Sequence, residues 1–326
     1  MRIIIKSFIL ILLCLLFAIA FYGLHFKSPP KLSLPGSLHT ASMDWGGYTR
    51  SYAYYIPEKI SANPALVFVF HGSLGDAEMS RSMYGYGFEQ IAEENGFIVI
   101  YPEGYKKHFN DCRKNGPYEA NKLAIDDVGF MQGLVAQFIQ THQANPREVF
   151  ATGVSNGGQM ALRLALEAPD LVAAVASVAA SLPTQDNLDC VPTAKSASVL
   201  VMNGTDDPMN PFHGGRVALY GLLGGRGEVI SSIATVKYFA ELAGHTHNPS
   251  IILLKDTVAD DNSRIEVTRW QDTDGETPRD SVALFRVVGG GHGAPHPDMK
   301  SPKVLGGSNQ DINAAEAIWA FFDDAR

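Results

Sequence analysis

The sequence predicts an α/β fold in which helices cover both faces of a mostly parallel central sheet. Residues 65–70 (ALVFVF) and 97–102 (FIVIYP) are apolar throughout, as expected for strands that are buried on both faces. Segments with helical periodicity alternate with such runs, an order typical of parallel sheets. Of the 326 residues, 46% are hydrophobic, which suffices for one large core or two modest ones. Because no internal repeat or linker is visible, we expect a single domain over residues 46–326.

The predicted elements follow one another in a regular order. A helix at residues 83–96 ends at Gly96, and a helix at 126–142 begins with two aspartates that suit the positive end of its dipole. The later helices are predicted at residues 156–169, where Pro169 ends the helix, at 232–244, which Gly244 caps, and at 311–325. The later strands are predicted at residues 148–153, 171–179, 197–204 and 281–288.

The N-terminus carries a segment of a different kind. A basic start is followed by residues 8–24, which hold no charge, and residues 18–20 (Ala-Ile-Ala) supply a cleavage signal. This pattern predicts a signal peptide over residues 1–20, followed by a Pro- and Ser-rich spacer over residues 21–45. The alternative is an uncleaved anchor that extends to residue 24, although residues 8–24 would span about 26 Å as a helix, just short of a typical hydrocarbon core. We expect a secreted or periplasmic protein, or in the alternative a membrane-anchored protein that faces outside the cytoplasm.

Charge and cysteine content narrow the class of protein. The net charge is −8 and no run of lysine or arginine is present, so we expect no nucleic-acid partner. Contact with a membrane is expected only if the N-terminal segment stays uncleaved. Beyond that segment the chain has two cysteines, Cys112 and Cys190, and an even number in an oxidising compartment predicts one disulfide. The chain-entropy model gives such a bridge about 4 kcal/mol of stabilisation. The alternative is a pair of free, buried thiols.

Residues 150–160 (FATGVSNGGQM) place Ser155 in a G-x-S-x-G pattern. The pattern alone is weak, because a glycine-rich chain produces it readily by chance. Here a predicted strand leads directly into it and a predicted helix leads directly out, which is the setting of a nucleophile elbow. The flanking glycines remove side chains that would clash in so sharp a turn. The alternative is an ordinary turn in which Ser155 caps the helix.

A nucleophilic serine needs a base, and the base needs an orienting carboxylate. In this kind of fold the order along the chain is serine, acid, histidine. The strand at residues 197–204 is followed by Asp206 and Asp207, and the strand at residues 281–288 is followed by His292. Functional groups gather at the carboxyl ends of such strands, so these residues are the candidate acid and base. Spacing alone does not choose between the two aspartates.

Other histidines compete with His292 for the role of base. His296 lies four residues further on and is the better rival, whereas His245 and His247 follow a helix rather than a strand. His292 lies within a run of glycines, which suits a loop that brings an imidazole close to other backbone. The alternative for His292 is a solvated histidine in a loop.

An oxyanion hole requires backbone N–H groups that point at the developing negative charge. One is expected from Asn156, the residue after the candidate nucleophile. The other is expected from the loop that follows the strand at residues 65–70, and Gly72 and Ser73 are equally good candidates. His71 in the same loop is more readily interpreted as a structural residue than as a catalytic one.

Seven segments together resemble the polyhydroxybutyrate depolymerase-like esterases, which are kin of feruloyl and acetylxylan esterases in the α/β-hydrolase superfamily. These segments are FHGSLGD, IVIYPEG, FNDC, DDVGFM, GVSNGGQM, NGTDDPMNPFHGG and GGGHGAPHP, and the resemblance extends over residues 65–320. It implies an α/β-hydrolase fold. It also implies that Asp207 rather than Asp206 is the acid and that His292 is the base.

The resemblance has three further implications. It supports a disulfide between Cys112 and Cys190, and it gives the aspartates at 126 and 127 a structural role at the start of a helix. Relatives often carry a tryptophan where Ala294 stands, so the acyl pocket is expected to be more open or differently shaped. Relatives that degrade solid polyester carry a linker and a polymer-binding module, whereas this chain ends at its last helix, so attack on crystalline polymer is not expected. The glycine-rich residues 220–229 are interpreted as a loop.

The predicted function is that of a secreted serine esterase that works through an acyl-enzyme. His292 would take the proton of Ser155, and Asp207 would hold the imidazole. No metal or organic cofactor is expected. The candidate substrates, small or oligomeric, are hydroxyalkanoate oligomers and feruloyl or acetyl esters. The alternatives are a peptidase of the same fold and a catalytically silent surface-binding protein.

Overall fold

The structure is a computed structural model that describes residues 29–271 and 280–326, together with Gly23, Phe26 and Lys27. The signal peptide predicted at residues 1–20 lies outside the described residues. In the described part of the chain, no helix has the length and apolar composition that crossing a bilayer requires.

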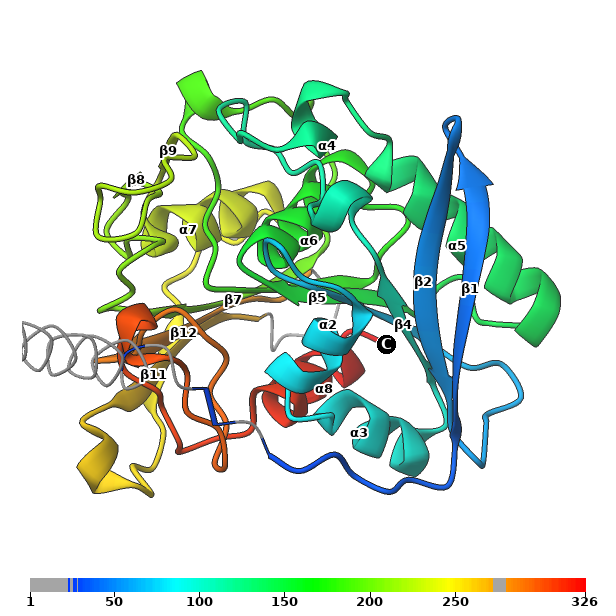
Figure 1. Cartoon of the computed structure of the whole chain (residues 1–326). Coiled ribbons are helices and arrows are strands. Elements are labelled where there is room, and N and C mark those ends of the chain that lie inside the picture. Colours follow the sequence, from blue (N-terminus) through cyan, green and yellow to red (C-terminus); the bar gives the residue numbers. More distant parts are fainter. Residues whose placement is uncertain (1–22, 24–25, 28, 272–279) are drawn as a thin grey trace, which may run out of the picture.

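Ten strands of the described residues form one sheet in the order β1-β2-β4-β3-β5-β6-β7-β12-β11-β10 (Figure 1). The six strands from β4 to β12 in this order are parallel, and antiparallel strands extend the sheet at both edges. The prediction of a mostly parallel sheet is confirmed. The parallel strands are β3 (Leu66–Phe70), β4 (Ile98–Pro102), β5 (Val149–Val154), β6 (Ala174–Val178), β7 (Ser198–Gly204) and β12 (Val282–Val288).

The antiparallel edges correct the predicted start of the domain. Residues 21–45 were expected to form a spacer, but β1 (Ser37–Trp45) pairs along its whole length with β2 (Tyr48–Ile56). Gly46 and Gly47, both with positive φ, form the tight turn between these two strands. The largely exposed, polar β1 lacks the apolar pattern by which buried strands are found. At the other edge lie β11 (Arg264–Trp270) and β10 (Ser250–Leu253), which were not predicted either.

Helices cover both faces of the sheet, as predicted (Figure 1). On one face lie α5 (Asp127–His142), α6 (Asn156–Glu167) and α7 (Ser232–Leu242). On the other face lie α2 (Ala77–Met83), α3 (Gly87–Asn95) and α8 (Ala314–Asp323). The helix predicted at residues 83–96 begins later, at Gly87, because Tyr86 has a φ of 60° and separates α3 from α2.

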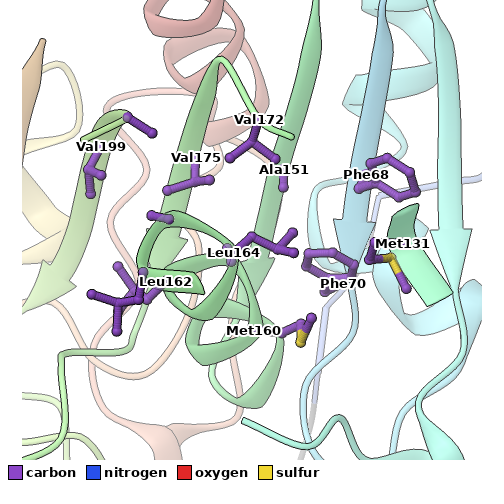
Figure 2. Packing of buried hydrophobic residues seen from close by; sticks show 14 of the residues in the cluster. Phe68, Phe70, Met131, Ala151, Met160, Leu162, Leu164, Val172, Val175 and Val199 are labelled. Atoms are coloured by element: carbon purple, nitrogen blue, oxygen red, sulfur yellow. The ribbon is translucent and has the colours of Figure 1, made fainter. Parts of the chain in front are cut away.

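The core on one face fixes the position of α6. Figure 2 shows Met160 and Leu164 of this helix among side chains of the parallel strands, including Phe70 and Val175. All four side chains are fully buried, and each contributes about 1.5–3 kcal/mol by leaving water. Because α6 is held over β5 and its neighbours, its first turn lies at the carboxyl end of β5.

Short elements and loops lie between the main ones. β8 (Gly215–Arg216) pairs with β9 (Glu228–Val229) in a separate two-stranded sheet, and α4 (Glu119–Lys122) lies between β4 and α5. Single 3₁₀ turns occur at Tyr105–Lys107, Gln185–Asn187, Ala259–Asp261 and Lys303–Leu305.

The predicted disulfide between Cys112 and Cys190 is confirmed, and the two Cα atoms lie 5.0 Å apart. It ties the loop after β4 to the segment before β7. Backbone contacts reinforce the tie, since the Asp189 amide donates to the Cys112 carbonyl at 2.9 Å. The loop after β4 is therefore anchored at a point far along the chain.

A buried ion pair joins the first turn of α5 to the N-terminal part of the sheet. Arg50 on β2 donates to the Asp127 carboxylate at 2.5 Å, and both side chains are buried. Asp127 also accepts the Asn110 amide at 2.6 Å, while Asp126 caps the helix by accepting from the Gly129 amide at 2.9 Å. Both aspartates therefore hold structure together at the start of α5.

The substitution Asp127→Ala should be strongly destabilising, because it leaves the buried Arg50 guanidinium without its counter-charge. We expect the free energy of unfolding to fall by about 3–5 kcal/mol in a denaturant titration. The matched control is Asp170→Ala, which breaks the exposed pair with Lys195 and should cost about 1 kcal/mol or less. Equal losses for the two variants would contradict a supporting role for the buried pair.

Candidate active site

Ser155 lies alone in the turn between β5 and α6. β5 ends at Val154, α6 begins at Asn156, and Ser155 has φ 59° and ψ −115°, a conformation that non-glycine residues rarely adopt. Its amide donates to the Val178 carbonyl at 2.8 Å, which fixes the turn against β6. The predicted strand–turn–helix setting of Ser155 is therefore present.

The glycines on either side of Ser155 are required by close approach of backbone. A Cβ atom at Gly157 would overlap the carbonyl oxygen of Phe70, and one at Gly153 would lie 2.8 Å from the Phe70 Cβ. Either contact is far shorter than real Cβ atoms make. The spacing of the G-x-S-x-G pattern therefore reflects how closely α6 packs on the end of β3.

The candidate acid and base are in direct contact. His292 Nδ1 lies 2.7 Å from Asp207 Oδ2. The other oxygen of Asp207 accepts the amides of Met209 and Asn210 at 2.7 and 2.8 Å, and its side chain is fully buried. Three hydrogen-bonding partners hold the Asp207 carboxylate in one orientation. Asp206, by contrast, is exposed and accepts from the Thr205 hydroxyl at 2.9 Å, away from His292.

A glycine-rich loop carries His292 over the end of β7. The His292 amide donates to the Leu305 carbonyl at 2.6 Å, and the Gly291 amide donates to the Gly307 carbonyl at 2.7 Å. A Cβ atom at Gly204, the last residue of β7, would overlap the Gly290 carbonyl. The loop can pass this close to β7 only because glycine occupies the crossing point.

Ser155 and His292 line the same cavity of about 460 Å³. Its other lining residues are mostly apolar: Phe26, Leu74, Met79, Met83, Met209, Ala294, Met299, Pro302 and Leu305. Ala294, for which the resemblance implied an altered pocket, is among them. No hydrogen bond joins the Ser155 hydroxyl to the His292 imidazole in the described chain, and such bonds often shorten only when substrate binds. The arrangement suits an ester whose apolar part enters the cavity.

The rival histidines lie elsewhere. His296 lines a different cavity, where its Nδ1 accepts the Asp298 amide at 3.1 Å and its ring lies against Gly85. His245 Nε2 lies 2.8 Å from the Asp280 carbonyl, beyond the end of α7. His292 is therefore the histidine that the fold brings into the cavity of Ser155.

His71 is fully buried and holds the loop after β3 in place. Its Nε2 accepts the Gly104 amide at 2.9 Å, so this nitrogen carries no proton, and Nδ1 donates to the Gly72 carbonyl at 2.7 Å. Burial lowers the pKa of His71 to about 4, which keeps the imidazole neutral. These contacts support the structural role that the sequence suggested for His71.

The loop after β3 presents free amides beside Ser155. Gly72 and Ser73 both line the cavity, and neither backbone amide donates to any described residue. The third candidate, Asn156, is locked in place by its side chain, which accepts the Phe109 amide at 2.8 Å and donates to Asp111 Oδ2 at 2.6 Å. Gly72 and Ser73 therefore line the cavity, and Asn156 directly follows Ser155 at the start of α6.

Three residues of the site were not predicted as such. Asp111, which fixes Asn156, also forms a buried ion pair with Arg113, and its place beside Cys112 in the FNDC segment was the available signal. Tyr118 and Arg226 hydrogen-bond to each other at the edge of the cavity. Nothing in the glycine-rich segment that holds Arg226 indicated that its side chain lines the cavity. Across the described residues, no group of three or more His, Cys, Asp or Glu side chains is placed to hold a metal ion.

Known proteins resemble this chain in sequence and in structure. Residues 50–186 match the family profile described as Esterase PHB depolymerase. The protein named "Putative esterase NocK" from Nocardia uniformis subsp. tsuyamanensis is 35% identical over 172 residues, covering 52% of this chain and 48% of that protein. "Acetylxylan esterase A" from Emericella nidulans is 32% identical over 149 residues, covering 43% of this chain and 45% of that protein. The chain thus spans about half the length of these relatives.

A solved structure shares the fold. The acetyl xylan esterase from Aspergillus awamori superposes with a TM-score of 0.54 at 18% identity, over 80% of this chain and 96% of that one. At this identity the likeness shows the fold alone, and it confirms the predicted fold class. The resemblance to polyhydroxybutyrate depolymerase-like esterases is confirmed for the matched segment.

The substitution Gly157→Ala should disrupt the turn that holds Ser155, because the new methyl group would overlap the Phe70 carbonyl oxygen. We expect a loss of about 1–3 kcal/mol in the free energy of unfolding, measured by chemical denaturation. Gly72→Ala is the matched control, since its Cβ would lie 3.5 Å from the nearest atom, an ordinary contact. A Gly157→Ala protein as stable as the control would show that close packing of α6 on β3 is not needed.

His71 should make stability depend on pH. Its pKa of about 4 in the folded protein lies below the unfolded value of 6.5, so the unfolded chain binds the extra proton as pH falls between these values. The contribution is fully present above pH 6.5 and is lost toward pH 4; we expect about 2 kcal/mol to disappear between pH 7 and pH 5. Denaturant titrations at the two pH values should show this loss in the wild type and not in His71→Gln. The control His213→Gln, which removes an exposed histidine, should show the same loss of stability as the wild type. A loss in His71→Gln equal to that of the wild type would contradict the assignment of this pH dependence to His71.

Proposed function

We propose that this chain, whose residues 50–186 match the Esterase PHB depolymerase profile, is a serine esterase that hydrolyses carboxylic esters through an acyl-enzyme. The observation that carries the proposal is the contact of 2.7 Å between His292 Nδ1 and the buried Asp207, in the cavity where Ser155 stands on its strained turn. The esterase relatives support the reaction type.

In the proposed reaction, the Ser155 Oγ attacks the carbonyl carbon while His292 Nε2 accepts the hydroxyl proton. Nε2 is the nitrogen available, because Nδ1 is engaged by Asp207. The bond to the alcohol oxygen then breaks, and the imidazolium gives its proton to the leaving oxygen. Water attacks the acyl-enzyme with His292 again as base, which releases the acid and restores the serine. These steps need neither a metal ion nor an organic cofactor.

The oxyanion that forms during attack would be bound by the Asn156 amide and by the Ser73 amide. The Gly72 carbonyl is held by His71 Nδ1 at 2.7 Å and by the Gly75 amide at 3.1 Å. In a trans peptide the N–H points opposite to the carbonyl, so the Ser73 amide is turned away from His71 and remains free to bind substrate. This favours Ser73 over Gly72 as the second donor.

The apolar lining of the cavity supports ester substrates with an aliphatic or aromatic part, small or oligomeric. Hydroxyalkanoate oligomers and feruloyl or acetyl esters fit this description, and the named acetylxylan esterase relative acts in the same class of reaction. We also propose that the protein acts outside the cytoplasm. The disulfide between Cys112 and Cys190 supports this location, since such bonds persist in oxidising compartments.

Replacing Ser155 by alanine should abolish ester hydrolysis without unfolding the protein, since only one oxygen atom is removed. The measurement is the rate of p-nitrophenyl acetate and butyrate hydrolysis by wild type and Ser155→Ala, with circular dichroism as the check on folding. A drop of about 10⁴-fold or more is expected when the nucleophile of such a triad is lost. Retained turnover in the variant would reject Ser155 as the nucleophile.

A fluorophosphonate probe separates an active esterase from a silent binding protein. The wild type should be labelled and Ser155→Ala should not. Ser82→Ala should be labelled like the wild type, because Ser82 is a residue of helix α2 whose hydroxyl donates to the Met79 carbonyl at 3.2 Å. An unlabelled wild type would favour a silent protein. Faster turnover of peptidyl amides than of acyl esters would favour a peptidase instead.

A further inference from the structure

One cationic side chain, Arg226, lines the mostly apolar cavity. Arg226 is the only arginine or lysine among the described residues that line it. It comes from the loop between β8 and β9, and no sequence pattern connects this loop with Ser155. A guanidinium in such surroundings is only partly hydrated, and an anionic ligand would compensate for the water that it lacks.

The Arg226 guanidinium is held in a fixed position. Its Nε donates to the Tyr118 hydroxyl, and its Nη1 donates to the Gly224 carbonyl at 2.8 Å. The Tyr118 ring stacks on His108 with ring centroids 4.0 Å apart, and its hydroxyl lies 3.0 Å from the Ser73 hydroxyl. The guanidinium is thereby tied to the loop that carries the proposed oxyanion donor Ser73.

Arg226 has no carboxylate partner among the described residues, whereas each of the buried arginines has one. Arg50 pairs with Asp127, Arg81 with Glu89 and Arg113 with Asp111. Arg226 is half-buried, and its Nη2 donates to no described residue. The side chain thus offers a positioned, uncompensated positive charge to whatever occupies the cavity. Carboxylates match the planar guanidinium best among the groups of small organic substrates.

We propose that Arg226 binds a free carboxylate carried by the substrate, so that this site selects anionic esters over neutral ones. The inference rests on the proposed esterase function and names a residue that determines its specificity. In a linear oligomer of a hydroxy acid, which is one such anionic ester, the single free carboxylate belongs to the terminal unit, whose hydroxyl is esterified to the next unit. A carboxylate bound by Arg226 would bring this last ester into the cavity that Ser155 also lines, so we expect this ester to be the one that is cleaved. Hydrolysis adds water across that ester and releases the terminal hydroxy acid with its hydroxyl restored, leaving the shortened acyl chain as an acid.

The candidate esters differ in whether they carry a negative charge. An oligomer of 3-hydroxybutyrate carries the required carboxylate next to its last ester. Acetylated sugars and methyl ferulate carry none, so they leave the guanidinium uncompensated in the cavity. The preference should also weaken at high salt, because a half-buried ion pair is partly screened.

The test compares kcat/KM for the 3-hydroxybutyrate dimer as its free acid and as its methyl ester, which differ only in the terminal charge. For the wild type we expect the acid to be preferred by about 10- to 100-fold, the range for a hydrogen bond to a charged group. Arg226→Gln should bring this ratio close to one. Arg226→Lys should retain part of the preference for the acid, because lysine keeps the positive charge but lacks the planar guanidinium that can donate two parallel hydrogen bonds. The control is Arg216→Gln, an exposed arginine of β8 outside the cavity, which should keep the wild-type ratio.

A wild-type enzyme that hydrolyses both forms equally well would overturn the proposal, and this result does not depend on the folding of any variant. An Arg226→Gln enzyme that keeps the wild-type ratio would also overturn it. Failure of the esterase function itself would look different, since the wild type would then hydrolyse neither form and would not be labelled by the fluorophosphonate.

Discussion

The geometry of the site depends on the turn between β5 and α6. A single residue, Ser155, joins a fully buried strand to a buried helix whose first turn lies on the backbone at the end of β3. No side chain fits at Gly153 or Gly157, and Ser155 must adopt a positive φ. The cost of this conformation, about 1–3 kcal/mol, is offset by the packing of α6 on the sheet. The core therefore holds the serine in a position that the isolated segment would not adopt.

Buried polar contacts position the loops that surround Ser155. His71 joins the loop after β3 to the one after β4, Asp207 is fixed by two amides, and the Asn156 side chain spans to Phe109 and Asp111. Each of these groups satisfies several hydrogen bonds at once, which makes its loop rigid. These buried polar contacts thus determine where the proposed acid, base and amides lie.

Both the charge and the shape of the cavity contribute to the recognition of substrate. Met209, Met299 and Leu305 line the cavity with apolar side chains, which favours apolar parts of a substrate. The small side chain of Ala294 lines the cavity as well. Arg226, positioned by Tyr118, adds a charge at one edge. Such a site would discriminate among esters by the apolar and charged groups that they carry in addition to the ester group.

The sequence by itself determined the parallel sheet, its buried helices, the turn around Ser155 and the disulfide, because each depends on a local pattern or a simple count of residues. Spacing narrowed the acid to two neighbours and the family resemblance implied Asp207, while the contact of Asp207 rather than Asp206 with His292 is a feature of the tertiary structure. The polar strand β1 and the cavity position of Arg226 carry no local signal. Both features depend on which distant segments lie side by side in the folded chain. A polar strand becomes part of a sheet only when another strand pairs with it, and an arginine becomes a candidate binding group only when no carboxylate lies beside it.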